Sequence, residues 1–128
     1  MTAARTFARQ ALEAEGFAVV RSANGARPVD LVAWRERDLR FIIVRRVRQH
    51  RPAPGVAVRF APELAALRAL PLPGGYACTA ELWLYHRLEG FRQFRVFQGG
   101  MMECGAPGGC TGPGRVTRTA GSFPGPSD

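Results

Sequence analysis

The stretch PVDLVAWRERDLRFIIVRR, residues 28–46, decides the fold of this chain. It holds two apolar segments separated by the polar sequence Glu-Arg-Asp, a pattern that predicts a β-hairpin with strands at 29–35 and 39–48. One carboxylate, Asp30, lies among Val, Leu and Ala in the first strand. Because an unpaired buried charge is costly, we expect Asp30 to have a partner of opposite charge.

Other elements follow on both sides of the hairpin. Apolar residues at helical spacing predict a helix over 3–15, which Gly16 ends. The later segments predict strands at 17–22, 76–87 and 91–98, loops at 23–28 and 49–55, a short extended piece at 56–60 and a helix at 61–70. The order helix, three strands, helix, two strands predicts an α/β fold with a mixed sheet flanked by helices.

The last 24 residues differ in composition from the rest. Eleven of the residues from Gly105 to Asp128 are Gly or Pro, and no apolar periodicity is present. We therefore expect one domain over 1–104 and a disordered tail over 105–128. The chain shows neither a membrane-spanning apolar run nor a secretory signal, and its odd number of Cys indicates free thiols, so we expect a cytoplasmic protein.

The charge is strongly basic. The chain has 18 basic residues against 10 acidic ones, a net charge of +8, and every basic residue is Arg. The missing Lys is typical of a GC-rich genome, but that bias does not remove Asp, so the net charge needs another explanation. A basic surface attracts nucleic acid, anionic lipid or an acidic protein.

A family resemblance is visible around the hairpin. The stretch ALEAEGFAVVRSANGARPVDLVAWRERDLRFIIVRRVR resembles the core of the PD-(D/E)XK nuclease superfamily, and it is most like the archaeal Holliday junction resolvases. The pairs Gly16-Phe17 and Arg21-Ser22, the loop at 23–28 and Asp30 carry the likeness. It implies a restriction-endonuclease-like core, DNA as partner and a role in DNA repair or recombination.

The resemblance also implies a magnesium site, and this sequence departs from it. Asp30 stands where the family has its first metal ligand. The family Glu falls at Ile43 and the family Lys at Arg45, so Asp30 and Arg45 are what remains of the catalytic set. The start of the first helix, where the family usually has another acid, carries Arg5 and Arg9, and the acids of this helix, Glu13 and Glu15, come only at its end. An arginine cannot act as a base, but the resemblance implies that Arg45 and Asp30 share one face of the hairpin, so we expect Arg45 to pair with Asp30.

A metal is expected only if another acid completes the site. Glu63 on the second predicted helix and Glu81 on the fourth predicted strand are the two candidates. An acid in the first turn of a helix is more often a surface residue that the helix dipole favours. Without such an acid, Asp30 alone binds Mg²⁺ weakly, and we expect no cofactor.

Arginines are dense around the hairpin. Guanidinium groups bind phosphate bidentately, so the resemblance implies a surface that follows the DNA backbone. The alternative is a solvated basic face in an Arg-rich protein. The candidate nucleic-acid contacts are Arg21, Ser22, Arg27, Arg45, Arg46, Arg48 and Arg51.

Three functions remain open from the sequence. The first is a catalytically inactive nuclease-fold module that binds DNA, branched DNA included, as a homodimer. The second is an active Mg²⁺-dependent, structure-selective endonuclease with a rearranged site. The third is a structural or protein-interaction module, because a fold alone does not determine function.

Overall fold

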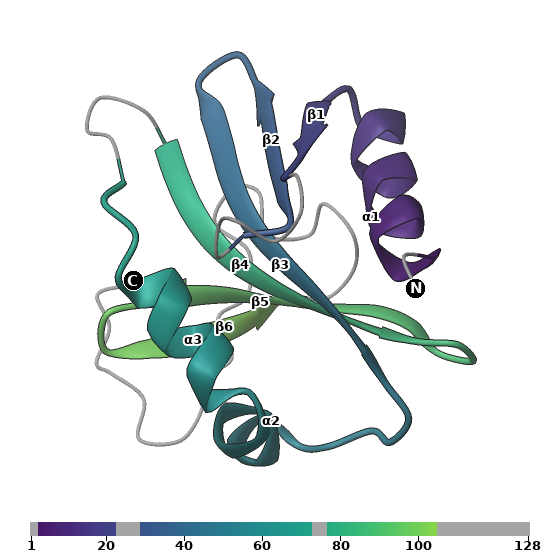
Figure 1. Cartoon of the computed structure of the whole chain (residues 1–128), viewed down its shortest axis with the longest axis vertical. Helices are drawn as coiled ribbons and strands as arrows, with labels where there is room; N and C mark the ends of the chain where they lie inside the picture. The colour runs from purple at the N-terminus through teal and green to yellow at the C-terminus, as the bar shows by residue number, and fades with distance from the viewer. Residues whose placement is uncertain (1–2, 23–28, 73–76, 105–128) are drawn as a thin grey trace.

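The computed structural model describes residues 3–22, 29–72 and 77–104 of the chain. Two layers of helix cover a single twisted sheet (Figure 1). The elements in chain order are α1 (Ala3–Ala14), β1 (Ala18–Arg21), β2 (Leu31–Arg35), β3 (Asp38–Val47), α2 (Ala53–Arg59), α3 (Ala61–Arg68), β4 (Ala77–His86), β5 (Gly90–Phe97) and β6 (Gly100–Cys104).

The sheet has six strands in the order β1-β2-β3-β4-β5-β6. All neighbours are antiparallel except β3 and β4, which run parallel from the pair Asp38–Ala77 to the pair Val47–His86. A parallel pair needs a long crossover, which α2 and α3 provide. The predicted fold class, a mixed sheet flanked by helices, is confirmed.

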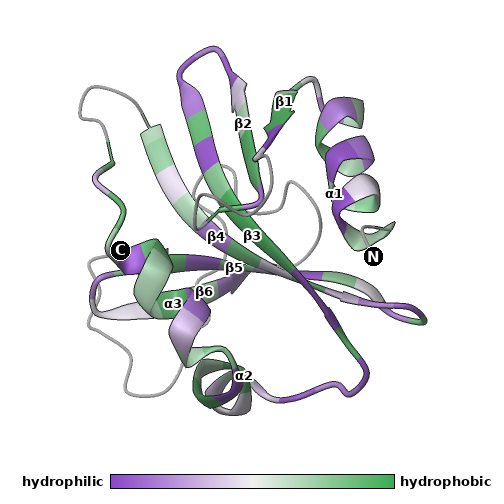
Figure 2. Ribbon diagram, in the orientation of Figure 1, coloured by the Kyte–Doolittle hydropathy of each residue, from purple (hydrophilic) through white to green (hydrophobic). Residues whose placement is uncertain are grey.

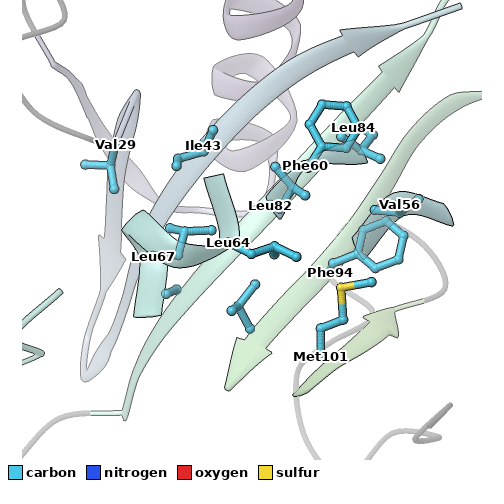
Figure 3. Close-up of a cluster of buried hydrophobic side chains, with 12 residues drawn as sticks. Val29, Ile43, Val56, Phe60, Leu64, Leu67, Leu82, Leu84, Phe94 and Met101 are labelled. Atoms are coloured by element: carbon cyan, nitrogen blue, oxygen red, sulfur yellow. The ribbon is translucent and has the colours of Figure 1, made fainter. Parts of the chain in front are cut away.

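The two faces of the sheet carry separate cores. Because side chains alternate along a strand, Ile42 and Ile43 of β3 point to opposite faces. Ile42 packs with Leu12 of α1, whereas Ile43 belongs to the core under α2 and α3 (Figure 3). In Figure 2 the middle of β3 is accordingly an unbroken apolar run. The hairpin strand β3 is therefore buried from both sides.

Gly16 ends α1 as predicted. Its φ of +94° lies in the left-handed region that favours glycine. The Gly16 N–H donates to the Glu13 carbonyl at 3.0 Å, and the Phe17 N–H donates to the Leu12 carbonyl at 3.1 Å. These bonds satisfy carbonyl groups at the helix end and direct the chain into β1.

Two predictions about the elements are wrong. The piece at 56–60, expected to be extended, lies mostly in α2, where Val56 is buried and the Phe60 N–H donates to the Val56 carbonyl at 2.9 Å. Tertiary burial of Val56 outweighs the strand preference of its branched side chain. The sequence analysis also missed β6, which Gln98 and Gly99 connect to β5.

Two further findings concern expectations about the environment of the chain. Cys104 is disulfide-bonded, so the expectation of free thiols is wrong for this residue. Within the described ranges, no helix combines the length and the apolar character needed to span a membrane. The predicted tail at 105–128 lies outside the described residues.

Candidate functional site

Asp30 lies where β2 separates from β3. Its backbone N–H donates to the Ile42 carbonyl at 2.9 Å, and the regular pairing begins one residue later, at Leu31. The Val44 N–H, which points toward β2, finds no backbone carbonyl there and donates to the Asp30 Oδ2 atom at 2.8 Å. The carboxylate therefore fills the gap between the two strands, close to the plane of the sheet.

Arg45 is the partner that the sequence analysis predicted for Asp30. The Arg45 Nη1 atom lies 3.1 Å from the Asp30 Oδ2 atom and 2.9 Å from the Val44 carbonyl oxygen. The Asp30 side chain is only 16% exposed, which makes an opposite charge necessary. The predicted ion pair is confirmed.

Glu63 of α3 joins the same guanidinium. The Arg45 Nε atom lies 3.0 Å from the Glu63 Oε2 atom, and the Glu63 side chain is 20% exposed. Arg45 points to the face that α3 covers, because it shares the orientation of Ile43. One guanidinium thus holds two carboxylates that are 33 positions apart in the sequence.

Arg5 of α1 is a site residue whose contact the sequence analysis did not predict. Its Nε atom lies 3.4 Å from the Asp30 Oδ1 atom, so the carboxylate has a cation on each of its oxygens. Arg5 comes from the helix that packs on one face of the sheet, whereas the Arg45 side chain points to the other face. The sequence offers a single signal for this contact: Arg5 follows Ala4, which is one of the α1 residues buried against the sheet.

The site does not fit a magnesium ion as it stands. Both Asp30 oxygens and the Glu63 Oε2 atom are paired with guanidinium nitrogens, and Ile43, at the position of the family Glu, is 1% exposed within the core. Among the described residues, no three His, Cys, Asp or Glu side chains group as metal ligands would. Mg²⁺ prefers several oxygen ligands or waters, and two arginines disfavour it further.

Glu81 does not come to this site. It lies on β4, so the whole width of β3 separates it from Asp30, a distance of about two strand spacings or 10 Å. The Glu81 side chain is fully buried and accepts hydrogen bonds from the Thr79 hydroxyl and the Trp83 indole, each at 2.8 Å. The hypothesis that Glu81 completes a metal site is therefore not supported by its position.

Glu81 belongs instead to a buried charged cluster. Arg40, 1% exposed, has its Nε atom 3.7 Å from the Glu81 Oε2 atom and also contacts Asp38. Burial lowers the pKa of the nearby Arg95, and Arg40 acts in the same direction, while Glu81 and Asp38 oppose them. The cluster is structural, since each partner compensates a charge that the sheet has taken out of water.

The remaining arginine candidates divide into three groups. Arg46, Arg48 and Arg51 are exposed and meet Arg59 of α2 around a hollow of about 330 Å³. Arg21 is exposed beside Ser22, whose backbone N–H donates to the Asp30 carbonyl at 2.8 Å. Arg27 lies outside the described residues.

A second basic hollow was not predicted. It measures about 670 Å³ and shares Arg46 and Arg48 with the first. Arg87, in the turn between β4 and β5, completes it. Arg59 and Arg87 were missed because each is a single arginine outside the dense run at 45–51, and only the fold places each of them beside that run, in a separate hollow.

Comparisons with known proteins show a likeness to solved structures. No family model matches the chain, and no curated protein matches it. Among solved structures, Hjc, a Holliday junction resolvase from the archaeal hyperthermophile Archaeoglobus fulgidus, is similar with 24% sequence identity and a TM-score of 0.42. The alignment covers 70% of this chain and 73% of that chain.

Proposed function

We propose that this chain is a nuclease-like module that binds DNA through its phosphate backbone and has no metal-dependent cleavage activity. The observation that carries the proposal is the pair of adjacent hollows lined by exposed arginines. In the described part of the chain, none of these arginines forms an ion pair with a carboxylate. They are Arg46, Arg48, Arg51, Arg59 and Arg87.

Phosphate is the ligand that suits such a surface. A guanidinium is always charged and offers a planar set of donors that matches two phosphate oxygens. Several like charges held side by side repel one another, and a polyanion relieves that repulsion. The affinity should then fall steeply with salt and depend little on base sequence.

The arrangement at Asp30 supports the absence of cleavage. Arg5 and Arg45 neutralise the Asp30 carboxylate where the resembled family would hold a cation. Ile43, at the position of the family Glu, packs in the hydrophobic core. This part of the proposal includes no cofactor. We extend the proposal to a homodimer that acts in the cytoplasm.

Binding is tested by a band-shift titration at low salt with branched and linear duplex DNA. The double variant Arg46→Gln/Arg48→Gln should weaken binding to both and lower the salt slope by about two, because two phosphate contacts are lost. Arg37→Gln is the matched control: Arg37 is exposed at the far end of β3, about 30 Å from Arg46. It should have a much smaller effect.

Three outcomes would overturn the proposal. Failure of the wild-type protein to bind either DNA at micromolar concentration excludes it. Cleavage of junction DNA with Mg²⁺ or Mn²⁺ that disappears in Asp30→Ala would replace it with an endonuclease. DNA affinity that is indifferent to charge reversal at Arg45, Arg46 and Arg48 would favour a protein-interaction module.

A further inference from the structure

The larger basic hollow lies at the carboxyl ends of the parallel strands. The pairing of β3 and β4 stops at Val47 and His86, after which β3 leads toward α2 and β4 enters the hairpin to β5 (Figure 1). Strands that separate in this way leave a crevice, and the carboxyl ends of parallel strands are a frequent ligand position. The crevice is lined by Arg46, Val47, Arg48, His86, Arg87 and Leu88.

The charge of this crevice favours an anion. Three of its lining side chains are guanidiniums, and none is a carboxylate. The His86 Nδ1 atom accepts hydrogen bonds from the Leu88 and Glu89 backbone N–H groups, each at 3.2 Å. The Glu89 carboxylate beside the turn is directed to His50, with an Oε1 to Nδ1 distance of 3.1 Å.

Aromatic side chains lie next to these cations. Arg46 is the Cα partner of Tyr85, and both share the sheet face that α1 covers. The Tyr85 ring lies 5.0 Å from Phe91 and 5.3 Å from Phe7, measured between ring centroids. Phe91 also contacts Trp83, so the four rings form a continuous row from Trp83 through Phe91 and Tyr85 to Phe7. Trp83 is buried, whereas Phe7 is 42% exposed.

Phe7 does not belong to the apolar stripe by which α1 packs on the sheet. The buried residues of that helix are Ala4, Ala8 and Leu12, and Phe7 flanks this stripe on the side of Tyr85. Phe7 contacts Tyr85, and Tyr85 is the strand neighbour of Arg46, so the exposed ring and the arginines belong to one face. Aromatic rings and arginines together bind the bases and the phosphates of a single strand. Stacking needs a free base face, which a continuous duplex does not offer.

We infer that this face binds an unpaired stretch of nucleic acid, with phosphates at Arg46, Arg48 and Arg87 and a base stacked on Phe7 beside Tyr85. The inference rests on the proposed function, since it assumes a nucleic-acid ligand. It goes further by assigning a single-stranded segment to the α1 face of the sheet. A module with this face would favour DNA in which single and double strands meet.

The test compares a short labelled oligothymidylate with a duplex of equal length by fluorescence anisotropy. Phe7→Leu keeps an apolar side chain but removes the ring, and it should weaken oligothymidylate binding about tenfold while leaving duplex binding unchanged. Phe7→Trp keeps a stacking surface and should retain the affinity. Phe97→Leu is the control, because Phe97 is 39% exposed at the opposite end of β5.

The outcomes separate this inference from the proposed function. Binding of duplex but not oligothymidylate by the wild-type protein overturns the inference alone. So does an equal effect of Phe7→Leu on both ligands, no effect on either, or a loss in Phe7→Trp as large as in Phe7→Leu. Failure to bind either ligand overturns the proposed function itself. Thermal melting of each variant verifies folding, and if Phe7→Leu is unstable, the comparison of oligothymidylate with duplex in the wild-type protein still tests the inference.

Discussion

The Arg45 Nη1 atom lies 3.1 Å from the Asp30 Oδ2 atom, and the Nε atom of the same guanidinium lies 3.0 Å from Glu63. One cation therefore joins an acid at the start of β2 to an acid at the start of α3. Without it the two carboxylates would repel each other across a partly buried site. Arg45 thus does for these acids what a bound metal ion would do in the family that the sequence resembles.

Asp30 should contribute to stability through two separable contacts. Asp30→Asn removes its charge but keeps an oxygen that can accept the Val44 N–H, so it should cost about 1 kcal/mol, because Arg5 and Arg45 are each partly exposed. Asp30→Ala also leaves the buried Val44 N–H without an acceptor, which should add about 1–3 kcal/mol. Urea unfolding of both variants measures the difference, and equal losses would contradict this division.

Ile43 should resist conversion into the second acid of a nuclease site. It is 1% exposed and packs in the core under α3, so Ile43→Glu places a charge among apolar side chains (Figure 3). We expect a loss of about 3 kcal/mol or more in the free energy of unfolding. Ile43→Val, the size control, should cost about 0.5–1.5 kcal/mol. A stable Ile43→Glu variant would show that this position still tolerates a ligand.

Local signals in the sequence predicted much of this fold. The helical spacing before Gly16 and the alternation on either side of the turn at 36–38 depend on neighbouring residues, and both elements are present. The partner of Asp30 could also be predicted, because strand alternation and the family spacing both placed Arg45 on the adjacent strand. Such predictions succeed when the contact lies within one hairpin.

Contacts that depend on the crossover could not be predicted in the same way. Glu63 reaches Arg45 only because α2 and α3 return the chain over the sheet, and the sequence analysis expected an extended piece where α2 begins to pack. Arg5 meets Asp30 across 25 positions with no periodic pattern that links them. Strand β6 was missed because its sequence, GMMEC, contains no β-branched or aromatic residue, which is the usual signal of a strand.

Glu81 should matter for stability and not for chemistry. Glu81→Gln removes the charge that compensates Arg40 and one of the acceptors for Thr79 and Trp83. Because the carboxylate is fully buried, we expect a loss of about 2–4 kcal/mol in unfolding free energy. DNA affinity of the folded variant should not change. Glu13→Gln, which affects only an exposed pair with Arg9, should cost about 0.5 kcal/mol or less.

Removal of the Arg45 guanidinium should create a metal site between Asp30 and Glu63. Arg45→Met keeps much of the side-chain length but leaves Asp30 and Glu63 without their shared cation. Two carboxylates drawn to one point bind a divalent ion weakly, so millimolar Mn²⁺ should raise the melting temperature of this variant by a few degrees. The wild-type protein should show no such rise.

The control for this experiment is the double variant Arg45→Met/Glu63→Gln. It has the same apolar replacement at position 45 but only one carboxylate, Asp30, beside Arg5, so Mn²⁺ should not stabilise it. Equal stabilisation of all three proteins would mean that Mn²⁺ binds elsewhere. A Mn²⁺ effect in the wild-type protein that disappears with Asp30→Asn would mean that a metal ion displaces Arg45, because only ion binding at that carboxylate explains both results.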